Sequence, residues 1–140
     1  MAWNTQTKSY TGTAASGTLL LTMDRAYDAS LSNPVSGGIG FVTPTQMTTT
    51  LPGPGVDLVK KIAQTYDTFT YTYQGTNYTG SRGNVLTLSD YAYGSGSAGG
   101  LLRQQVLSYL HDSDSNYIAK NIIRRVINVQ TKDRDCPEFR

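Results

Sequence analysis

Basic and aromatic side chains lie close together in one part of the chain. Two lysines precede the stretch 65-TYDTFTYTYQGTNYTG-80, which holds four tyrosines and six threonines among sixteen residues, and an arginine follows it. Cations that hold phosphate groups and rings that stack unpaired bases are the two components of a single-stranded RNA surface. The candidate RNA-binding residues are Lys60, Lys61, Tyr71, Tyr73 and Arg82.

The same stretch has the period of a β-strand. Phe69, Tyr71 and Tyr73 alternate with threonines, so the aromatic rings share one face of the predicted strand. Residues 84-NVLTLSDYAY-93 alternate in the same way, and turn residues lie between the two segments at 75–77 and 80–84. We predict a hairpin between these two strands. Tyrosine and threonine are also ordinary sheet formers, and the sequence alone favours that second interpretation of their density.

Catalytic and metal-binding groups are scarce. His111 is the single histidine, and its place at a predicted helix end favours a capping role. No cluster of residues has the spacing of a zinc or calcium site, and no phosphate-loop or nucleophile-elbow motif occurs. We therefore expect no enzyme activity, no metal and no cofactor.

The composition suggests a chain that assembles. The 140 residues fit a single domain, 1–140, in which 16% of residues are charged, against roughly 25% in ordinary soluble domains. A surface rich in threonine, tyrosine and glycine costs less to bury than one rich in lysine and glutamate. The net charge of +2 is too small for a dedicated basic domain, so any RNA site must be local.

The sequence has no clear targeting segment and a single cysteine. The first residues lack a basic segment followed by an apolar run, and no membrane-spanning stretch is visible, so we expect a soluble protein made in the cytosol without a membrane partner. Cys136 is the single cysteine and lies in the polar tail, residues 130–140. A free thiol is favoured there over a disulfide between chains.

The remaining segments suggest a β-rich part, residues 1–93, followed by helices. Residues 8–13 and 17–27 form a predicted N-terminal hairpin, 28–40 a loop, and 41–51 a strand that Pro44 should restrict to a sheet edge or split. Residues 56–66 have helical spacing, which we favour, although a strand remains an alternative. A helical pair is predicted in 101–129, as an amphipathic helix at 101–111 and a second helix at 116–129.

The order of these parts resembles the coat proteins of the single-stranded RNA bacteriophages. The closest likeness lies in 84-NVLTLSDYAYGSGSAGGLLRQQVLSYLHDSDSNYIAKNII-123, where a threonine-rich strand leads through small residues into two apolar segments. The resemblance implies an α+β fold, with an N-terminal hairpin and an antiparallel sheet followed by two C-terminal α-helices, in an interlocked dimer. That family has no helix before its central strands, so 56–66 would be a strand or an insertion.

The resemblance also implies where partners bind. The helices of one chain would pack on the sheet of the other, which places the dimer interface on Leu102, Val106, Tyr109, Leu110, Ile118 and Ile122. Lysines and tyrosines of the opposite sheet face would touch genomic RNA inside an icosahedral shell, assembled in the host cytoplasm into a virion. Two alternatives stay open. One is another phage structural or interaction protein, such as a tail, neck or decoration protein or an inhibitor of host defence; the other is a small enzyme or ligand-binding domain.

Overall fold

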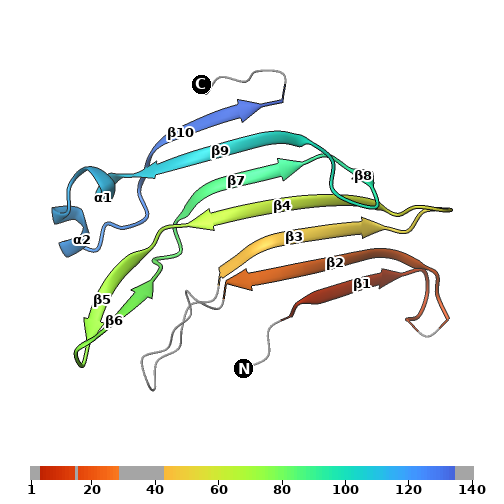
Figure 1. Ribbon diagram of the computed structural model, residues 1–140, viewed down its shortest axis with the longest axis horizontal. Helices are drawn as coiled ribbons and strands as arrows, with labels where there is room; N and C mark the ends of the chain where they lie inside the picture. The colour runs from red at the N-terminus through yellow and green to blue at the C-terminus, as the bar shows by residue number, and fades with distance from the viewer. Residues whose placement is uncertain (1–3, 15, 29–42, 135–140) are drawn as a thin grey trace.

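The protein forms one broad antiparallel sheet and a separate small hairpin (Figure 1). A computed structural model describes residues 4–14, 16–28 and 43–134. Within them the main sheet has the order β1-β2-β3-β4-β7-β9-β10, and the short β8 pairs with β4. The strands of this sheet are β1 (Gln6–Tyr10), β2 (Leu19–Asp28), β3 (Thr43–Leu51), β4 (Leu58–Tyr66), β7 (Val85–Tyr91), β8 (Gly94–Ser95), β9 (Leu101–Tyr109) and β10 (Val126–Asp133).

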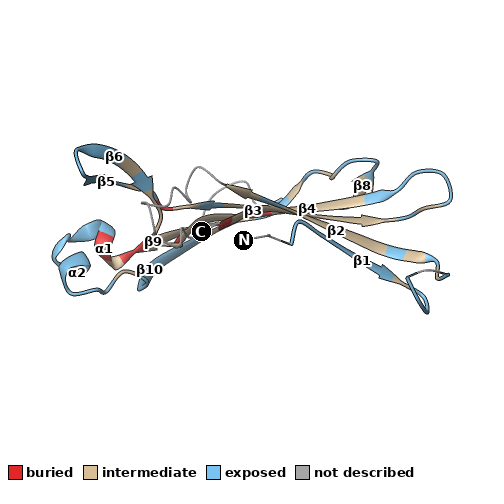
Figure 2. Cartoon of the chain, turned by 90° about the horizontal axis from the view of Figure 1, so that it is seen from below, coloured by how far each residue is buried: buried red, intermediate tan, exposed pale blue. Residues whose placement is uncertain are grey.

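The main sheet is a single layer. Seen along its edge in Figure 2, the strands of the main sheet lie in one twisted layer, and no other described strand or helix packs across either face as a second layer. Among the apolar residues of the described ranges, Tyr109 alone is buried, with 5% of its surface exposed. The described part of the chain therefore has no hydrophobic core of its own.

The two faces of the sheet differ in chemistry. Residues paired directly across neighbouring strands share a face, and successive residues along a strand alternate between faces. One face, here called the leucine face, carries Leu21, Met23, Met47, Leu51, Leu58, Ile62, Leu88, Leu107 and Val129. The other, here called the threonine face, carries Thr22, Thr48, Thr50, Lys61, Thr65, Thr87, Ser89, Tyr91 and Gln104.

The predicted N-terminal hairpin is confirmed, whereas Pro44 does not lie at an edge. β1 pairs with β2 in antiparallel fashion, and β3 lies between β2 and β4 inside the sheet. Pro44 is tolerated there because β4 pairs with β3 only from Gln46 onward, so Pro44 has a paired strand on one side alone, and the register with β2 shifts beside it, between Ala26 and Tyr27. The predicted loop at 28–40 falls almost wholly outside the described residues, as does Cys136.

The predicted helix at 56–66 is wrong, and the alternative, a strand, is confirmed. β4 pairs with β3 on one side and with β7 on the other. A strand in the middle of a sheet has its backbone hydrogen bonds satisfied on both sides. That gain outweighs a weak helical spacing of apolar residues.

The predicted C-terminal helices are also largely wrong. Residues 101–109 form β9, and the second predicted helix is reduced to one turn followed by β10. The β-branched run of Val126, Ile127 and Val129 suits a strand better than a helix. Two one-turn helices remain in this region, α1 (Leu110–Ser113) and α2 (Asn116–Ala119), so the coarse order of a sheet with helices near the C-terminal end is confirmed.

The predicted hairpin between residues 68–73 and 84–93 is wrong, because each of its two strands pairs with another strand. β5 (Phe69–Tyr73) is a strand, as predicted, but it pairs with β6 (Thr76–Gly80) in a separate two-stranded sheet. Gln74 and Gly75 both have positive φ angles, 49° and 79°, as a two-residue hairpin turn requires. This two-residue turn is shorter than the loop at 80–84, so the segment that pairs with β5 is the one directly after the turn, residues 76–80. We call β5, β6 and their turn the arm; it projects from one end of the main sheet (Figures 1 and 2).

Candidate nucleic-acid interface

The five predicted RNA-binding residues occupy three different places. Lys61 lies on the threonine face, in the middle of the sheet. Lys60 lies on the opposite, leucine face, where its Nζ is 3.0 Å from Asp90 Oδ1. Tyr71, Tyr73 and Arg82 belong to the arm and its base. The structure therefore does not bring the five together in one surface.

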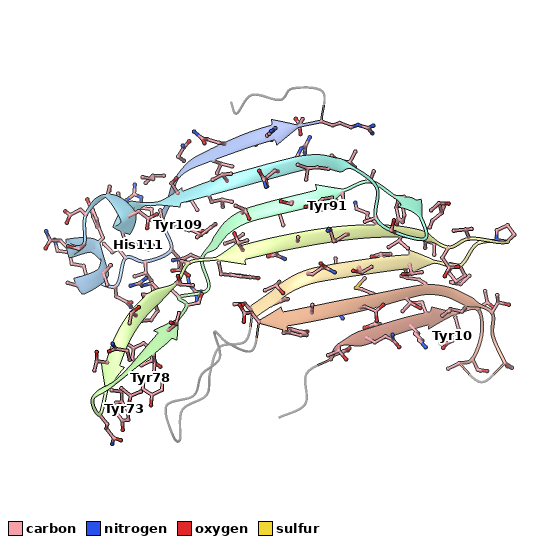
Figure 3. The ribbon with its side chains drawn as sticks, in the orientation of Figure 1. Tyr10, Tyr73, Tyr78, Tyr91, Tyr109 and His111 are labelled. Atoms are coloured by element: carbon pink, nitrogen blue, oxygen red, sulfur yellow. The ribbon has the colours of Figure 1, made fainter. Side chains whose placement is uncertain are left out.

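Lys61 is surrounded by groups that can bind a polar ligand. Its Nζ lies 4.2 Å from the centroid of the Tyr91 ring, a cation–π contact. Thr65 and Thr87 face each other across two strands, with their hydroxyl oxygens 2.7 Å apart. Gln104 donates a hydrogen bond of 3.1 Å to the Ser89 hydroxyl. These hydroxyl, amide and ammonium groups share one face of the sheet with the ring of Tyr91, which Figure 3 labels, and with the apolar side chains of Val59, Ala63 and Val106.

The sequence patterns did not single out most of this surface. Tyr91, Ser89 and Gln104 were not among the candidate residues, and they come from strands β7 and β9. The alternation in 84–93 carried the signal, because it places Thr87, Ser89 and Tyr91 on one face. The sequence does not reveal which strands are neighbours in the sheet, and the neighbours determine which residues lie opposite one another.

Charge is distributed unequally between the two faces. On the leucine face, Lys60 pairs with Asp90, and Arg103 Nε lies 2.6 Å from Asp133 Oδ1. Arg25, on the same face, donates a hydrogen bond to the Thr7 hydroxyl. On the threonine face, Asp24 accepts a hydrogen bond from Gln6, and Lys61 lies against the Tyr91 ring. The two faces therefore differ in charge pairing: two ion pairs between strands lie on the leucine face, whereas Lys61 on the threonine face contacts an aromatic ring.

A buried junction fixes the base of the arm. Asp67 Oδ1 accepts hydrogen bonds from the backbone nitrogens of Arg82 and Asn84, each at 3.1 Å, and from the Ser81 hydroxyl at 3.0 Å. Asn84 donates from its side chain to Asp67 Oδ2 at 3.1 Å and to the Ile123 carbonyl at 2.8 Å. Asp67 and Asn84 are both buried. The junction links the arm to the segment that precedes β10.

Tyr109 completes the packing beside this junction. Its hydroxyl donates a hydrogen bond of 2.9 Å to the Val85 carbonyl, one residue after Asn84. Burial raises the pKa of the Tyr109 phenol, and the nearby charge of Asp67 raises it further. The phenol therefore stays neutral and remains a hydrogen-bond donor across the ordinary pH range.

The predicted dimer stripe is divided by the strand geometry. Leu102 and Val106 lie on the face of β9 that Gln104 shares, whereas Tyr109 is buried within its own chain. Leu110 lies in α1, and Ile118 and Ile122 are exposed in and after α2, at 39% and 38%. These six residues do not form one apolar stripe, because β9 alternates where a helix would not.

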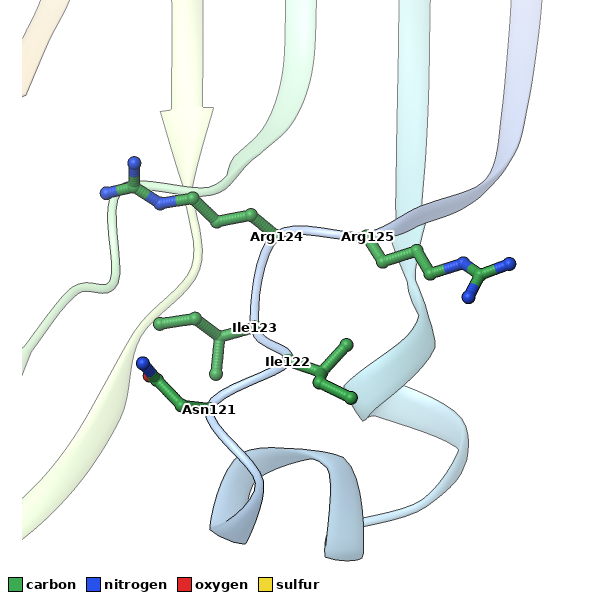
Figure 4. Close-up of a pocket in the computed structure, with 5 residues that line it drawn as sticks. All are labelled: Asn121, Ile122, Ile123, Arg124 and Arg125. Atoms are coloured by element: carbon green, nitrogen blue, oxygen red, sulfur yellow. The ribbon is translucent and has the colours of Figure 1, made fainter.

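A shallow pocket of about 530 Å³ lies beside the arm and is lined by residues 121–125. In Figure 4 the side chain of Arg124 extends toward the point where β4 leads into the arm, and that of Arg125 extends the other way.

His111, in the one-turn helix α1, is buried, and its Nε2 lies 3.4 Å from Asp112 Oδ1. Within the described ranges no three His, Cys, Asp or Glu side chains are grouped to hold a metal ion.

No described helix has the length and apolar character needed to span a bilayer. A scan against protein-family models finds no match for this chain, and neither do searches of curated proteins and of solved structures.

Proposed function

We propose that this chain is a structural viral coat protein, which forms a homodimer, assembles into an icosahedral shell and packages single-stranded RNA. The observation that supports this most is the single-layer sheet with two chemically different faces and no core of its own among the described residues. A sheet of this kind is stabilised when further molecules cover at least one of its faces.

The exposed area is consistent with burial against further copies. The chain exposes 9155 Å², whereas a compact monomer of 15.2 kDa exposes about 7,100 Å². The excess of about 2,000 Å² is more than twice the roughly 800 Å² that one partner contributes to a standard interface. An area of this size is sufficient for burial against at least one further copy.

The edge strand β10 is the proposed dimer contact. Val126, Ile127 and Val129 expose 41%, 51% and 46% of their surfaces, and no described strand pairs with the outer edge of β10. An exposed apolar edge is a template for another strand. Antiparallel pairing of β10 with the β10 of a second copy, around a twofold axis, would join two sheets into one. This contact replaces the predicted stripe from Leu102 to Ile122 in the proposal.

The threonine face is the proposed contact for RNA. It combines Lys61 with the hydroxyl and amide groups of Thr65, Thr87 and Gln104. Contacts of this kind recognise the sugar and phosphate backbone with little dependence on base sequence. That property suits packaging of a long RNA by many identical subunits.

Electron microscopy of the purified protein, together with its absorbance at 260 and 280 nm, tests the proposal. The expected result is closed particles with a nucleic-acid absorbance ratio that falls after nuclease treatment of disrupted particles. Dispersed monomers free of nucleic acid would overturn it. Rings or tubes without RNA would instead support a tail, neck or decoration protein.

A further inference from the structure

The arm presents a continuous row of aromatic rings. The ring centroids of Phe69 and Tyr71 are 5.9 Å apart, and those of Tyr71 and Tyr78 are 5.5 Å apart with an interplanar angle of 23°. Tyr73 and Tyr78 extend from the outer part of the arm in Figure 3, and Tyr73 is 41% exposed. Four rings from two strands thus share one face of a two-stranded ribbon.

Gly80 allows these rings to lie flat on the ribbon. It pairs with Phe69 across the arm, and a Cβ atom at this position would lie 2.9 Å from Phe69 Cζ and 3.3 Å from Tyr71 Cε1. The two rings therefore occupy the space over the Gly80 backbone. Rings that lie along a ribbon expose their flat faces, which are the surfaces on which other planar groups stack.

Two arginines lie at the base of the row. The Arg82 guanidinium lies 4.3 Å from the centroid of the Phe69 ring, and its Nη1 lies 3.6 Å from Asp67 Oδ2. Arg124 extends toward the same base in Figure 4. Residues 68–83 contain no aspartate or glutamate. The only acid at the base, Asp67, is buried and paired with Arg82, which leaves Arg124 as the exposed cation there among the described residues. A row of rings with an exposed arginine at its base complements a polyanion that carries planar groups, which is the chemistry of unpaired nucleotides.

We propose that the arm stacks unpaired bases on Tyr71, Tyr73 and Tyr78, while Arg124, at its base, holds an adjoining phosphate. This inference rests on the proposed function, because it takes the packaged RNA as the ligand. It divides the work between two surfaces. The threonine face holds RNA backbone whether or not the bases are paired, and the arm selects segments whose bases are free to stack.

Binding of the full-length protein to short fluorescent RNAs tests the division. The probes are a 12-nucleotide oligouridylate and a self-complementary duplex of equal length, each measured by fluorescence anisotropy. The variant with Tyr71→Leu and Tyr73→Leu keeps apolar side chains on the arm but loses the stacking faces. We expect its affinity for oligouridylate to fall about five- to hundredfold, with little change for the duplex.

Two controls separate the arm from the sheet. The variant with Thr70→Val and Thr72→Val alters the opposite face of the arm, and it should bind both RNAs as the original chain does. Lys61→Gln should weaken binding of both RNAs to a similar degree. Circular dichroism of each variant establishes that the sheet is retained.

The outcomes are distinguishable. If the double tyrosine variant keeps its affinity for oligouridylate while Lys61→Gln weakens both RNAs, the arm proposal is wrong and the proposed function stands. If the original chain binds neither RNA, both proposals fail. Equal loss of both RNAs in the double tyrosine variant would also contradict selective stacking by the arm.

Discussion

The carboxylate of Asp67 accepts two hydrogen bonds from Asn84, one from its backbone nitrogen and one from its side-chain amide, both at 3.1 Å. The two residues are seventeen positions apart and enclose the whole arm. Because the same amide also donates to the Ile123 carbonyl, the arm is joined to a third segment at its base. The direction in which the aromatic row projects therefore depends on this one pair.

Removing the carboxylate should loosen the arm. Asp67→Ala leaves the buried nitrogens of Arg82 and Asn84 without an acceptor, so we expect the free energy of unfolding to fall by about 1–3 kcal/mol. Urea denaturation followed by circular dichroism measures the loss. Asp24→Ala, which removes a half-buried carboxylate that accepts one hydrogen bond, from the Gln6 side chain, should change stability by less, by about 0.5 kcal/mol. Similar values for the two variants would show that the junction contributes little.

The neighbouring lysines 60 and 61 offer a matched pair on opposite faces. Lys61→Gln should lower RNA affinity and reduce the slope of log affinity against log salt by about 0.7, as expected for one lost contact to a single strand. Lys60→Gln should leave that slope unchanged, because Lys60 is paired with Asp90 on the leucine face. Filter binding at several salt concentrations gives both slopes. Equal effects of the two substitutions would contradict the assignment of RNA to the threonine face.

A charge on the outer strand should prevent dimerisation. Ile127→Lys places an ammonium group on the exposed apolar edge of β10, where a partner strand would have to desolvate it. We expect monomers by light scattering where the original chain gives dimers or shells. Thr7→Lys adds the same charge to β1 at the other edge and should not change the oligomeric state. Loss of assembly in the β1 variant instead would move the dimer contact to that edge.

A methyl group at Gly80 should disturb the aromatic row. Gly80→Ala forces the Phe69 ring to move, because the added carbon would lie 2.9 Å from it. We expect a changed tyrosine signal in near-ultraviolet circular dichroism and a stability loss of about 1–3 kcal/mol. Gly100→Ala is the control, since an added Cβ there has no atom within 4 Å. An unchanged spectrum for Gly80→Ala would show that the rings do not rest on this glycine.

The sequence predicted the β-rich first half better than the second. Alternation located strands at 43–51, 69–73 and 85–91, because a two-residue period is characteristic of strands and of few other structures. It could not identify the partner of each strand, so β5 was paired with the wrong segment. The helices expected in 101–129 followed from the helical spacing of apolar residues such as Leu102, Val106 and Leu110, and from the capping residues at 112–115. Pairing with β7 and β10 overrides that pattern in β9.

The candidate site was predicted only in part. Lys61 could be proposed from its charge and its nearness to tyrosines, but its place opposite Lys60 depends on β4 being a strand. The junction of Asp67, Asn84 and Ile123 could not be anticipated, because Asn84 and Ile123 are 39 positions apart and meet only in the folded chain. Polar residues in turns were assigned to the turns themselves, whereas two of them hold the arm in place.

The two edge strands of the main sheet differ in polarity, and this difference limits how far the sheet can grow by strand pairing. A ribbon that lengthens without limit needs two adhesive edges, as amyloid fibrils have. β10 offers one apolar edge, whereas β1 at the opposite end is five residues long and polar, with Lys8 at its centre. The proposed pairing through β10 would consume the adhesive edge of both chains and leave a lysine-bearing strand at each end. The joined sheet would then stop growing at two copies, which would leave further association to its faces and its arm.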